Sequence, residues 1–462
     1  MPSKSKAPIE GYKAAPPSLH YEFGGPIGAL GVTLAVPFFT YWLAFACTKE
    51  ACPRWPLSEL LDFHAKGASA MFSGDAAWWS GLWSWEGTAV YFGWYAWTVL
   101  CWAVLPGKEV EGTVMRDGNR LTYKMNGALR LDFLFDEVVS NAYHYHAACA
   151  TLFASLLIVA GATATVGLGP LLYISEHWAE LVSASLVMST VQACFVYAQS
   201  FQPDMMLALG GNTPSSFFNW FIGRSLNPRL GTFDIKSFNE MRPGLILWVI
   251  IDLAMLAKQY ASLGRVTDSL CLVVAFHSWY VFDAEWNESA ILSTMDLTTD
   301  GFGFMLSVGD LTWVPFTYCY SARYLALYPN DLGYAKTLGI LGVQFLGYWI
   351  FRGSNGEKND FRAGDNPKNL TFLQTQRGTK LLTSGWWGLS RHPNYMGDWI
   401  MSWAWCLPAG FATPLPYFYV VFFAILLVHR GIRDDEACAH KYGKDWDTYK
   451  KLVPSRIIPY LY

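Results

Sequence analysis

Long apolar runs dominate the pattern of this chain from about residue 25 to residue 429. A helix needs about 20 apolar residues to cross the hydrocarbon core of a bilayer. Runs that approach this length lie at 25–47, 86–105, 147–174, 178–201, 243–262, 266–284, 304–328, 335–351, 396–412 and 414–429. The pattern therefore predicts an all-α polytopic integral membrane protein with about ten transmembrane helices.

The segments between these runs differ in character. Apolar and polar residues alternate from Thr113 to Tyr123 around Asp117-Gly118, which is typical of a β-hairpin with a type I′ turn. Residues 210–242 and 352–391 are polar and are interpreted as long loops. Basic residues concentrate in cytoplasmic loops, so the basic 352–391 segment and the 430–456 tail are predicted to face the cytosol.

Composition agrees with a membrane protein. The chain is 53% hydrophobic and 15% charged, whereas soluble proteins carry about 25% charged residues. Its 22 Trp and 25 Tyr suit many bilayer interfaces. A net charge of −3 gives no reason to expect nucleic acid as a partner. The 1–17 segment is polar, so a cleaved signal peptide is not expected.

Cysteine and histidine spacing predicts no metal site. None of the nine cysteines forms a C-x-x-C pair, and several lie inside apolar runs. We interpret them as small buried hydrophobes and expect no disulfide framework. His144 and His146 lie near Glu137, but no third ligand follows at a spacing typical of metal sites.

The richest chemistry lies in the last third of the chain. The stretch FRGSNGEKNDFR places Arg352, Lys358 and Arg362 among Asn side chains. Basic side chains combined with amides and Tyr hydroxyls suit a polyanionic ligand such as a dinucleotide phosphate. An ordinary basic cluster that touches lipid headgroups is the alternative. No G-x-G-x-x-G follows a strand, so such a ligand would bind among membrane helices and not in a Rossmann fold.

Two further groups of ionisable residues are candidates for catalysis. If the last apolar helix continues past His429, Arg430 and Asp434 lie one turn apart on one face. Acidic side chains also follow Tyr280 closely. They are Asp283, Glu285, Glu288, Asp296 and Asp300. Ionisable residues at membrane depth are costly and are usually functional, although a polar surface loop would explain Glu285 and Asp300 equally well.

The C-terminal motifs carry a family resemblance. The stretches LLTSGWWGLSRHPNYMGD and HRGIRDDEACAHKYGKDWDTYKKLVPSRIIPYLY resemble the signature end of the sterol reductase family. That family includes Δ14-, Δ7- and C-24(28)-sterol reductases and the membrane domain of lamin B receptor. The resemblance begins at Tyr21-Glu22-Phe23-Gly24-Gly25-Pro26 and continues to the C-terminus.

The Δ14 branch fits best. LPGKEVEGTVMRDGNRLTYKMNG and YWIFRGSNGEKNDFR are similar to that branch. The Δ7 branch typically has T-I-D-I-C-H-D-x-F-G where this chain has TMDLTTDGFG, and the C-24(28) branch lacks the R-D-G-x-R-L-x-Y-x-x-N-G stretch. About twenty polar residues stand where lamin B receptor has a soluble module, which implies a stand-alone enzyme of the fungal kind.

The resemblance implies a single membrane domain, 21–462, after a polar segment, 1–20. It also implies an NADPH pocket formed by 335–462. The cofactor-binding residues expected from motif positions are Lys358, Arg362, Trp387, Arg391, His392, Asn394, Asp398, Arg430, Asp434, Tyr442 and Tyr449. The implied reaction is NADPH-dependent reduction of a Δ8,14-diene sterol to the Δ8 sterol, by protonation and then hydride transfer, in ergosterol-type biosynthesis.

Residue roles and location follow as expectations. The catalytic candidates are Tyr280, Asp434 and Arg430. The substrate-binding candidates are Asp283, Glu288 and Asp296. The protein is expected in the endoplasmic reticulum membrane, with its cofactor site facing the cytosol. Its expected partners are a sterol substrate taken from the bilayer, membrane lipids and other sterol-biosynthesis enzymes. The alternatives are a Δ7 or C-24(28) reductase, a non-catalytic sterol-binding scaffold, a transporter and a membrane thiol methyltransferase.

Overall fold

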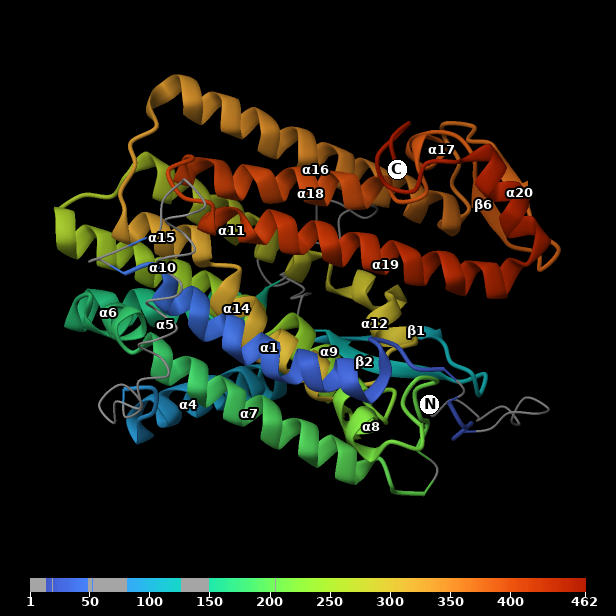
Figure 1. The fold of residues 1–462 in the computed structure, drawn as a ribbon, viewed down its shortest axis with the longest axis horizontal. Coiled ribbons are helices and arrows are strands. Elements are labelled where there is room, and N and C mark those ends of the chain that lie inside the picture. The colour runs from blue at the N-terminus through green and yellow to red at the C-terminus, as the bar shows by residue number, and fades with distance from the viewer. Residues whose placement is uncertain (1–13, 19, 49–51, 53–80, 126–148, 204) are drawn as a thin grey trace, which may run out of the picture. The chain divides into compact units, whose positions relative to one another are not determined.

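The computed structural model describes residues 14–18, 20–48, 52, 81–125, 149–203 and 205–462 (Figure 1). The described chain is mostly helical and holds three antiparallel two-stranded sheets. It divides into two compact units, Met1–Val266 with His277–Leu327, and Thr267–Phe276 with Tyr328–Tyr462. The metal alternative considered for His144, His146 and Glu137 lies outside the described residues.

Helices of the first unit occupy most of the apolar runs. They are α1 (Gly25–Ala46), α4 (Trp85–Val104), α5 (Ala150–Val166), α6 (Gly169–Glu176), α7 (Trp178–Gln199), α8 (Ser216–Ile222), α9 (Ile235–Met241), α10 (Pro243–Leu263), η1 (Glu288–Ser293), α12 (Met295–Thr298), α13 (Phe304–Val308), the π-helical η2 (Gly309–Trp313), α14 (Val314–Thr317) and α15 (Tyr320–Leu327). The helix α11 (Asp268–Trp286) contributes to both units. The predicted 304–328 span is therefore a broken helix, interrupted by a π-helical turn.

Several helices are long and apolar enough to cross a membrane. Among the described residues there are four such segments: Gly25–Ala46, Trp178–Gln199, Ile235–Leu263 and Leu415–Tyr442. The pair α5 and α6, bent by 109°, would be a fifth. Large apolar side chains on α1 are open to the surroundings, with Ile27 85% exposed and Leu34 64% exposed, as on a lipid-facing surface. The chain is therefore a helical membrane protein.

The predicted hairpin is confirmed, but its predicted turn class is wrong. Strands β1 (Lys108–Val114) and β2 (Arg120–Met125) pair antiparallel. The Gly118 amide donates to the Met115 carbonyl, and only Gly118 in this turn has a positive φ, of 83°. A type I′ turn needs two residues with positive φ, so this is a type I turn followed by a left-handed glycine.

The 210–242 segment is not the plain loop that its polarity suggests. It contains α8, α9 and a two-stranded sheet of β3 (Arg229–Leu230) and β4 (Phe233–Asp234). Ser215 and Asp234 cap the two helices by accepting hydrogen bonds from backbone amides. Phe218 and Phe221 are fully buried and anchor the segment in an apolar cluster. Capping residues and single buried rings thus organise a segment of low overall hydrophobicity.

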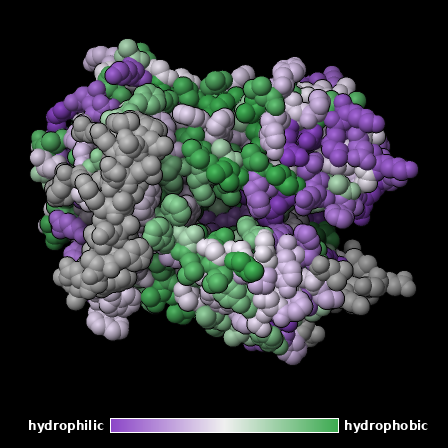
Figure 2. All heavy atoms as spheres, in the orientation of Figure 1, coloured by the Kyte–Doolittle hydropathy of each residue, from purple (hydrophilic) through white to green (hydrophobic). Residues whose placement is uncertain are grey.

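Helices of the second unit carry the polar C-terminal motifs. They are α16 (Gly333–Ala363), α17 (Trp386–Leu389), α18 (Pro393–Cys406), η3 (Leu407–Ala409), η4 (Leu415–Tyr417), α19 (Phe418–Tyr442) and α20 (Lys444–Leu452), with strands β5 (Phe372–Gln374) and β6 (Lys380–Leu382) between α16 and α17. Hydrophilic side chains gather over α17, β6 and α20 (Figure 2). The 352–391 segment was predicted to be a loop, but its first twelve residues continue α16 to Ala363.

Close contact between α16 and α18 frames this unit. A Cβ atom added to Gly397 would lie 2.6 Å from the Phe351 backbone nitrogen and 2.7 Å from the Gly347 carbonyl oxygen. A Cβ atom added to Gly347 would lie 2.8 Å from the Gly397 carbonyl oxygen. Small residues let helix backbones approach closely in membranes. Glycine is therefore required at this crossing for steric reasons.

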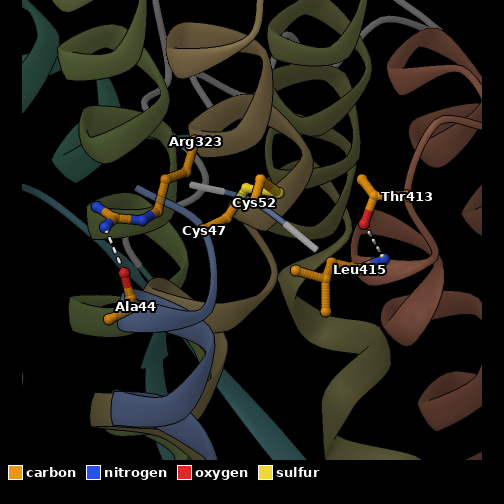
Figure 3. Close-up of a disulfide and its surroundings, with 6 residues drawn as sticks. All are labelled: Ala44, Cys47, Cys52, Arg323, Thr413 and Leu415. Carbon is orange, nitrogen blue, oxygen red and sulfur yellow. Dashed lines mark hydrogen bonds between the residues drawn. A yellow bond between two sulfur atoms is a disulfide. The ribbon is translucent and has the colours of Figure 1, made fainter. Parts of the chain in front are cut away.

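One prediction about cysteines is wrong. Cys47 and Cys52 form a disulfide at the end of α1 (Figure 3). Of the cysteines predicted to be buried inside apolar runs, Cys101 and Cys406 are free and buried, whereas Cys194 and Cys271 are free but exposed, so that part of the prediction is wrong for them. Sequence reasoning looked for C-x-x-C pairs, whereas this pair has four intervening residues.

Candidate active site

The cofactor candidates lie in the second unit. They come from the polar ends of α16 and α19, from α17 and α20, and from α18 with the residues just before it. Lys358 belongs to the last turns of α16, and its Nζ lies 3.8 Å from the centre of the Trp387 ring. Trp387 is buried, and its indole N–H donates to the Ser354 carbonyl at 2.8 Å. Burial and the neighbouring Arg362 lower the pKa of Lys358 to about 8. The structure thus brings Lys358 and Trp387 together as a half-buried cation on an aromatic face.

Arg391 holds the C-terminal segment in place. Its guanidinium is buried and donates to the carbonyls of Val453 and Pro454, each at 2.9 Å. Its Nε lies 3.9 Å from Asp435 Oδ1. Burial lowers the pKa of Arg391, and the Asp435 carboxylate opposes that shift. Contacts with carbonyls of the chain thus occupy at least part of the guanidinium.

His392 and Asp434 meet beside Tyr395. The rings of His392 and Tyr395 stack with centroids 4.7 Å apart, and the Tyr395 hydroxyl donates to Asp434 Oδ2 at 2.8 Å. The His392 Nδ1 atom lies 3.9 Å from the same oxygen. Burial, reinforced by nearby cations that include Lys358, lowers the pKa of His392 to about 3. This imidazole is therefore neutral at physiological pH.

Tyr442 and Tyr449 both pack against the ring of Trp446. Their rings lie 6.2 and 5.1 Å from the Trp446 ring, whose indole N–H donates to Asp435 at 3.0 Å. Burial raises the pKa of Tyr449 to about 12. These rings hold α20 against α19, so both tyrosines contribute to the packing of the candidate site.

Several buried polar atoms of this cluster lack an internal partner. Among the described residues, the Ser390 Oγ, Asn394 Oδ1 and Arg456 Nε atoms make no hydrogen bond although they are shielded from solvent. Buried polar groups normally form hydrogen bonds. Each of these three atoms can therefore form a hydrogen bond with a bound molecule. Arg362 is exposed, whereas Asp398 and Arg430 are half-buried on α18 and α19. The donor set fits an anionic ligand with many hydrogen-bonding groups.

Sequence reasoning missed several residues of this cluster. Tyr395, Asp435 and Arg456 were not singled out, although each makes a polar contact to the predicted residues or to their partners. Tyr395 follows His392 by three residues at the start of α18, a spacing that places both side chains on one face. That spacing was a usable signal. Arg456 lies more than 60 residues from His392 in sequence, so the sequence offered no comparable signal for its place in the cluster.

The catalytic candidate Tyr280 lies in the first unit, beside a buried polar pair. Its half-buried ring lies 6.1 Å from the ring of the fully buried Trp248. The Trp248 indole nitrogen is 3.2 Å from His277 Nδ1, which in turn is 2.8 Å from Asp252 Oδ2. Neither Asp252 nor His277 was predicted, because each stands alone inside an apolar run.

Two of the predicted substrate-binding residues have partners in the 229–242 segment. Glu288 is buried in an ion pair with Arg242. The fully buried Lys236 donates to the carbonyls of Asp296 and Asp300, at 2.6 and 2.8 Å. These bonds fix the acidic segment. Asp283 is half-buried on α11.

A separate apolar groove of about 700 Å³ lies in the first unit. Side chains of α5, α6 and α10 line it, and Thr163 and Tyr260 are its polar members. The Thr163 hydroxyl donates to its own helix, at the Val159 carbonyl. The groove thus offers a surface for a lipid but no carboxyl group or histidine.

Fold and site together define a helical membrane protein with a cation-rich polar cluster in its C-terminal unit. The chain belongs to the Ergosterol biosynthesis ERG4/ERG24 family, whose model matches residues 17–462. It is 49% identical to the Delta(14)-sterol reductase erg24 of Schizosaccharomyces pombe, over 96% of this chain and 97% of that protein. It is 41% identical to the enzyme of Candida albicans and 40% identical to that of Saccharomyces cerevisiae, each over 97% of this chain and 99% of the relative. Both are also named Delta(14)-sterol reductase.

Proposed function

We propose that this protein reduces the Δ14 double bond of a Δ8,14-diene sterol, with NADPH as the hydride donor, in ergosterol-type biosynthesis. The observation that carries the proposal is near full-length identity of 40–49% to proteins named Delta(14)-sterol reductase. The polar cluster of α16, α18, α19 and α20 supports it, because its basic and amide groups suit a dinucleotide phosphate. The proposal includes one membrane domain, 21–462, with the cofactor held by 335–462.

The chain's own residues would position the reactants and move the proton. Lys358 and Arg362 would bind phosphate, and Trp387 would support Lys358. The neutral His392 and the Asn394 amide would accept or donate hydrogen bonds to the ligand. NADPH, when bound, supplies the hydride. The proton must be added first, at carbon 15, because an unactivated alkene accepts hydride only after protonation creates a tertiary cation at carbon 14.

The proton donor is proposed to be Tyr280 or Asp434, with Arg430 close to Asp434 in sequence. A positioned acid contributes roughly 10²–10⁴-fold in rate. Tyr280 stands beside the Trp248 ring, and Asp434 accepts the Tyr395 hydroxyl. Exclusion of water is needed around either donor, because a cation in an aqueous site would be captured by solvent.

The direct test is conversion of a Δ8,14-diene sterol by the purified chain, with the product identified by mass spectrometry. The Δ8 sterol, formed with consumption of NADPH, is the expected product. Reduction of a Δ7 or C-24(28) bond instead would assign the chain to another branch. Sterol binding without NADPH consumption would indicate a non-catalytic scaffold.

Cofactor preference provides a sharper prediction. NADPH should be preferred over NADH, because only NADPH carries the 2′-phosphate that Lys358 and Arg362 would bind. Lys358→Ala or Arg362→Ala is expected to weaken NADPH binding by about 1–3 kcal/mol, the range for hydrogen bonds to charged groups. Lys444→Ala, at an exposed position on α20, is the matched control and should bind normally. Equal activity with both cofactors would contradict the prediction.

A pH dependence follows from the lowered pKa of Lys358. With a pKa of about 8, the Lys358 amine is protonated and positively charged below that pH. It loses the proton and the charge as the pH rises above about 8. Phosphate binding favours the charged form, so the Kd for NADPH is expected to rise above about pH 8. Lys358→Arg keeps its charge throughout this range and should flatten the profile. Titrations of both proteins from acidic to alkaline pH measure the difference, and parallel profiles would refute the assignment.

The proposed membrane topology has about ten spans in the endoplasmic reticulum, with the polar end of the second unit in the cytosol. Basic residues around the β5–β6 hairpin support this orientation. Trypsin added to sealed microsomes is expected to cleave at the exposed Arg377, which lies in the hairpin turn. A lumenal marker protein should stay intact in the same sample. Cleavage after Arg377 that occurs only once detergent is added would place the polar end of the second unit in the lumen.

A further inference from the structure

The disulfide stands where a membrane-spanning helix ends. The candidate span α1 finishes at Ala46, and the next residue, Cys47, is bonded to Cys52 (Figure 3). Cys47 is only 2% exposed. The seven other cysteines of the chain are free, including the exposed Cys194 and Cys271. Oxidation is therefore confined to the one pair at this end of α1.

A second contact fixes the same end of the helix. The Arg323 guanidinium of α15 donates to the Ala44 carbonyl at 2.7 Å and lies 4.6 Å from the Trp178 ring. Carbonyl groups in the last turn of a helix lack helical partners and favour a nearby cation. The α1 terminus is thus held by an arginine and by a covalent bond.

Formation of the disulfide requires an oxidant. Two cysteine thiols lose two protons and two electrons when their sulfur atoms bond. An oxidised dithiol oxidoreductase accepts the electrons through thiol–disulfide exchange and becomes reduced. Such oxidants operate in the lumen of the endoplasmic reticulum, whereas the cytosol keeps thiols reduced. A disulfide at one end of a membrane span therefore indicates which side of the membrane that end faces.

Contacts within the first unit identify which connections share each end of α1. Near the disulfide end, the Tyr41 hydroxyl is 2.5 Å from Ser183 Oγ, close to the start of α7. Glu180, also at the start of α7, bonds Ser84 at the start of α4. The segments that follow α4 and α7 therefore lie at the opposite end. Arg116 of the first segment donates to the Leu207 carbonyl of the second.

Charge differs between the two ends. The 105–125 and 200–242 segments, opposite the disulfide, hold eight basic residues: Lys108, Arg116, Arg120, Lys124, Arg224, Arg229, Lys236 and Arg242. The 47–84 and 167–177 segments, which join α1 to α4 and α5 to α7 at the disulfide end, hold three: Lys49, Arg54 and Lys66. Lys and Arg accumulate on the cytosolic side of membrane proteins. This bias agrees with the side indicated by the disulfide.

We propose that Cys47 and Cys52 are oxidised in the lumen, so that α1 runs from the cytosol at Gly25 to the lumen at Ala46. The disulfide serves as a staple for the lumenal end of α1. The β1–β2 hairpin and the 200–242 segment then face the cytosol. The inference does not depend on the proposed reductase activity, and its tests measure neither NADPH nor sterol.

The first experiment tests the bond in the full-length chain expressed in microsomes. Free thiols are blocked with N-ethylmaleimide under denaturing conditions, disulfides are then reduced, and new thiols are labelled with a maleimide polymer that retards the chain on a gel. Two adducts are expected in the wild-type chain and in Cys438→Ser. None are expected in Cys47→Ser or Cys52→Ser. Absence of adducts in the wild-type chain would overturn the proposal without any variant having to fold.

The second experiment tests sidedness by N-glycosylation, which occurs only in the lumen. One variant receives an Asn-x-Thr acceptor inserted between residues 53 and 80. The other is Leu121→Thr, which completes an acceptor beginning at Asn119 in the hairpin turn. An endoglycosidase-sensitive mass shift is expected for the first variant and none for the second. A shift in the second variant, or no shift in the first, would overturn the proposed orientation.

Discussion

At least one of two single substitutions, Tyr280→Phe or Asp434→Asn, is expected to lower sterol turnover by roughly 10²–10⁴-fold, the usual contribution of a positioned acid. Tyr280→Phe removes only a hydroxyl from a ring that rests near Trp248, so NADPH affinity should stay nearly unchanged. Asp434→Asn removes the acid but keeps the shape. It can also loosen the cofactor, because Asp434 accepts the Tyr395 hydroxyl within the candidate site.

Matched controls separate loss of the proton donor from general damage. Tyr334→Phe makes the same chemical change at an exposed position on α16, and Glu436→Gln does so for a carboxyl exposed on α19. Both controls should turn over sterol normally. Single-turnover rates and NADPH titrations measure the two effects separately. Near wild-type turnover in both test variants, at normal expression, would reject both donors and direct the search to Asp283, Glu288 and Asp296.

Apolar run length located most of the helices, because burial in lipid demands it. Only four or five of the described segments are long and apolar enough to cross a membrane, so the predicted count of about ten spans is not confirmed. The same criterion failed where a helix leaves the apolar layer. The α16 helix continues through Arg352 and Lys358 to Ala363 despite Gly353 and Gly356. Tertiary contacts, such as the bond from the Trp387 indole to the Ser354 carbonyl, override the low helix propensity of these glycines. In the 210–242 segment, Lys236 is fully buried and donates to backbone carbonyls, a contact between distant segments that local composition does not reveal.

The candidate site was partly visible in the sequence. The motif positions Lys358, Trp387, His392 and Asp434 fall in the same unit. Lys358 lies over the Trp387 ring, and His392 lies 3.9 Å from the Asp434 carboxyl group. Their roles toward a cofactor remain predictions. The supporting residue Arg456 reaches Asp435 from the C-terminal segment, so its place depends on tertiary packing. The Cys47–Cys52 bond depends on the compartment in which the chain folds, a property that cysteine spacing alone does not encode.

The crossing of α16 and α18 is expected to be the most sensitive steric point of the second unit. Gly397→Leu should abolish the folded state of this unit and with it NADPH binding. Even the single methyl group of Gly397→Ala should cost about 1–3 kcal/mol, the usual range for overpacking. The reason is that the added Cβ atom would meet backbone atoms of Phe351 and Gly347, which move only if the two helices separate.

Glycines elsewhere on α16 provide the contrast that makes this prediction specific. No neighbouring atom lies within 4 Å of a Cβ atom built on Gly339 or Gly342. Alanine at either position should therefore leave the melting temperature unchanged or raise it, because alanine favours helix by about 1 kcal/mol over glycine. Thermal unfolding in detergent, followed by size-exclusion chromatography, compares the four variants. A normal melting temperature for Gly397→Leu would mean that α16 and α18 do not cross at these glycines. Since Lys358 and His392 are carried by these two helices, NADPH affinity should fall with the melting temperature only in the Gly397 variants.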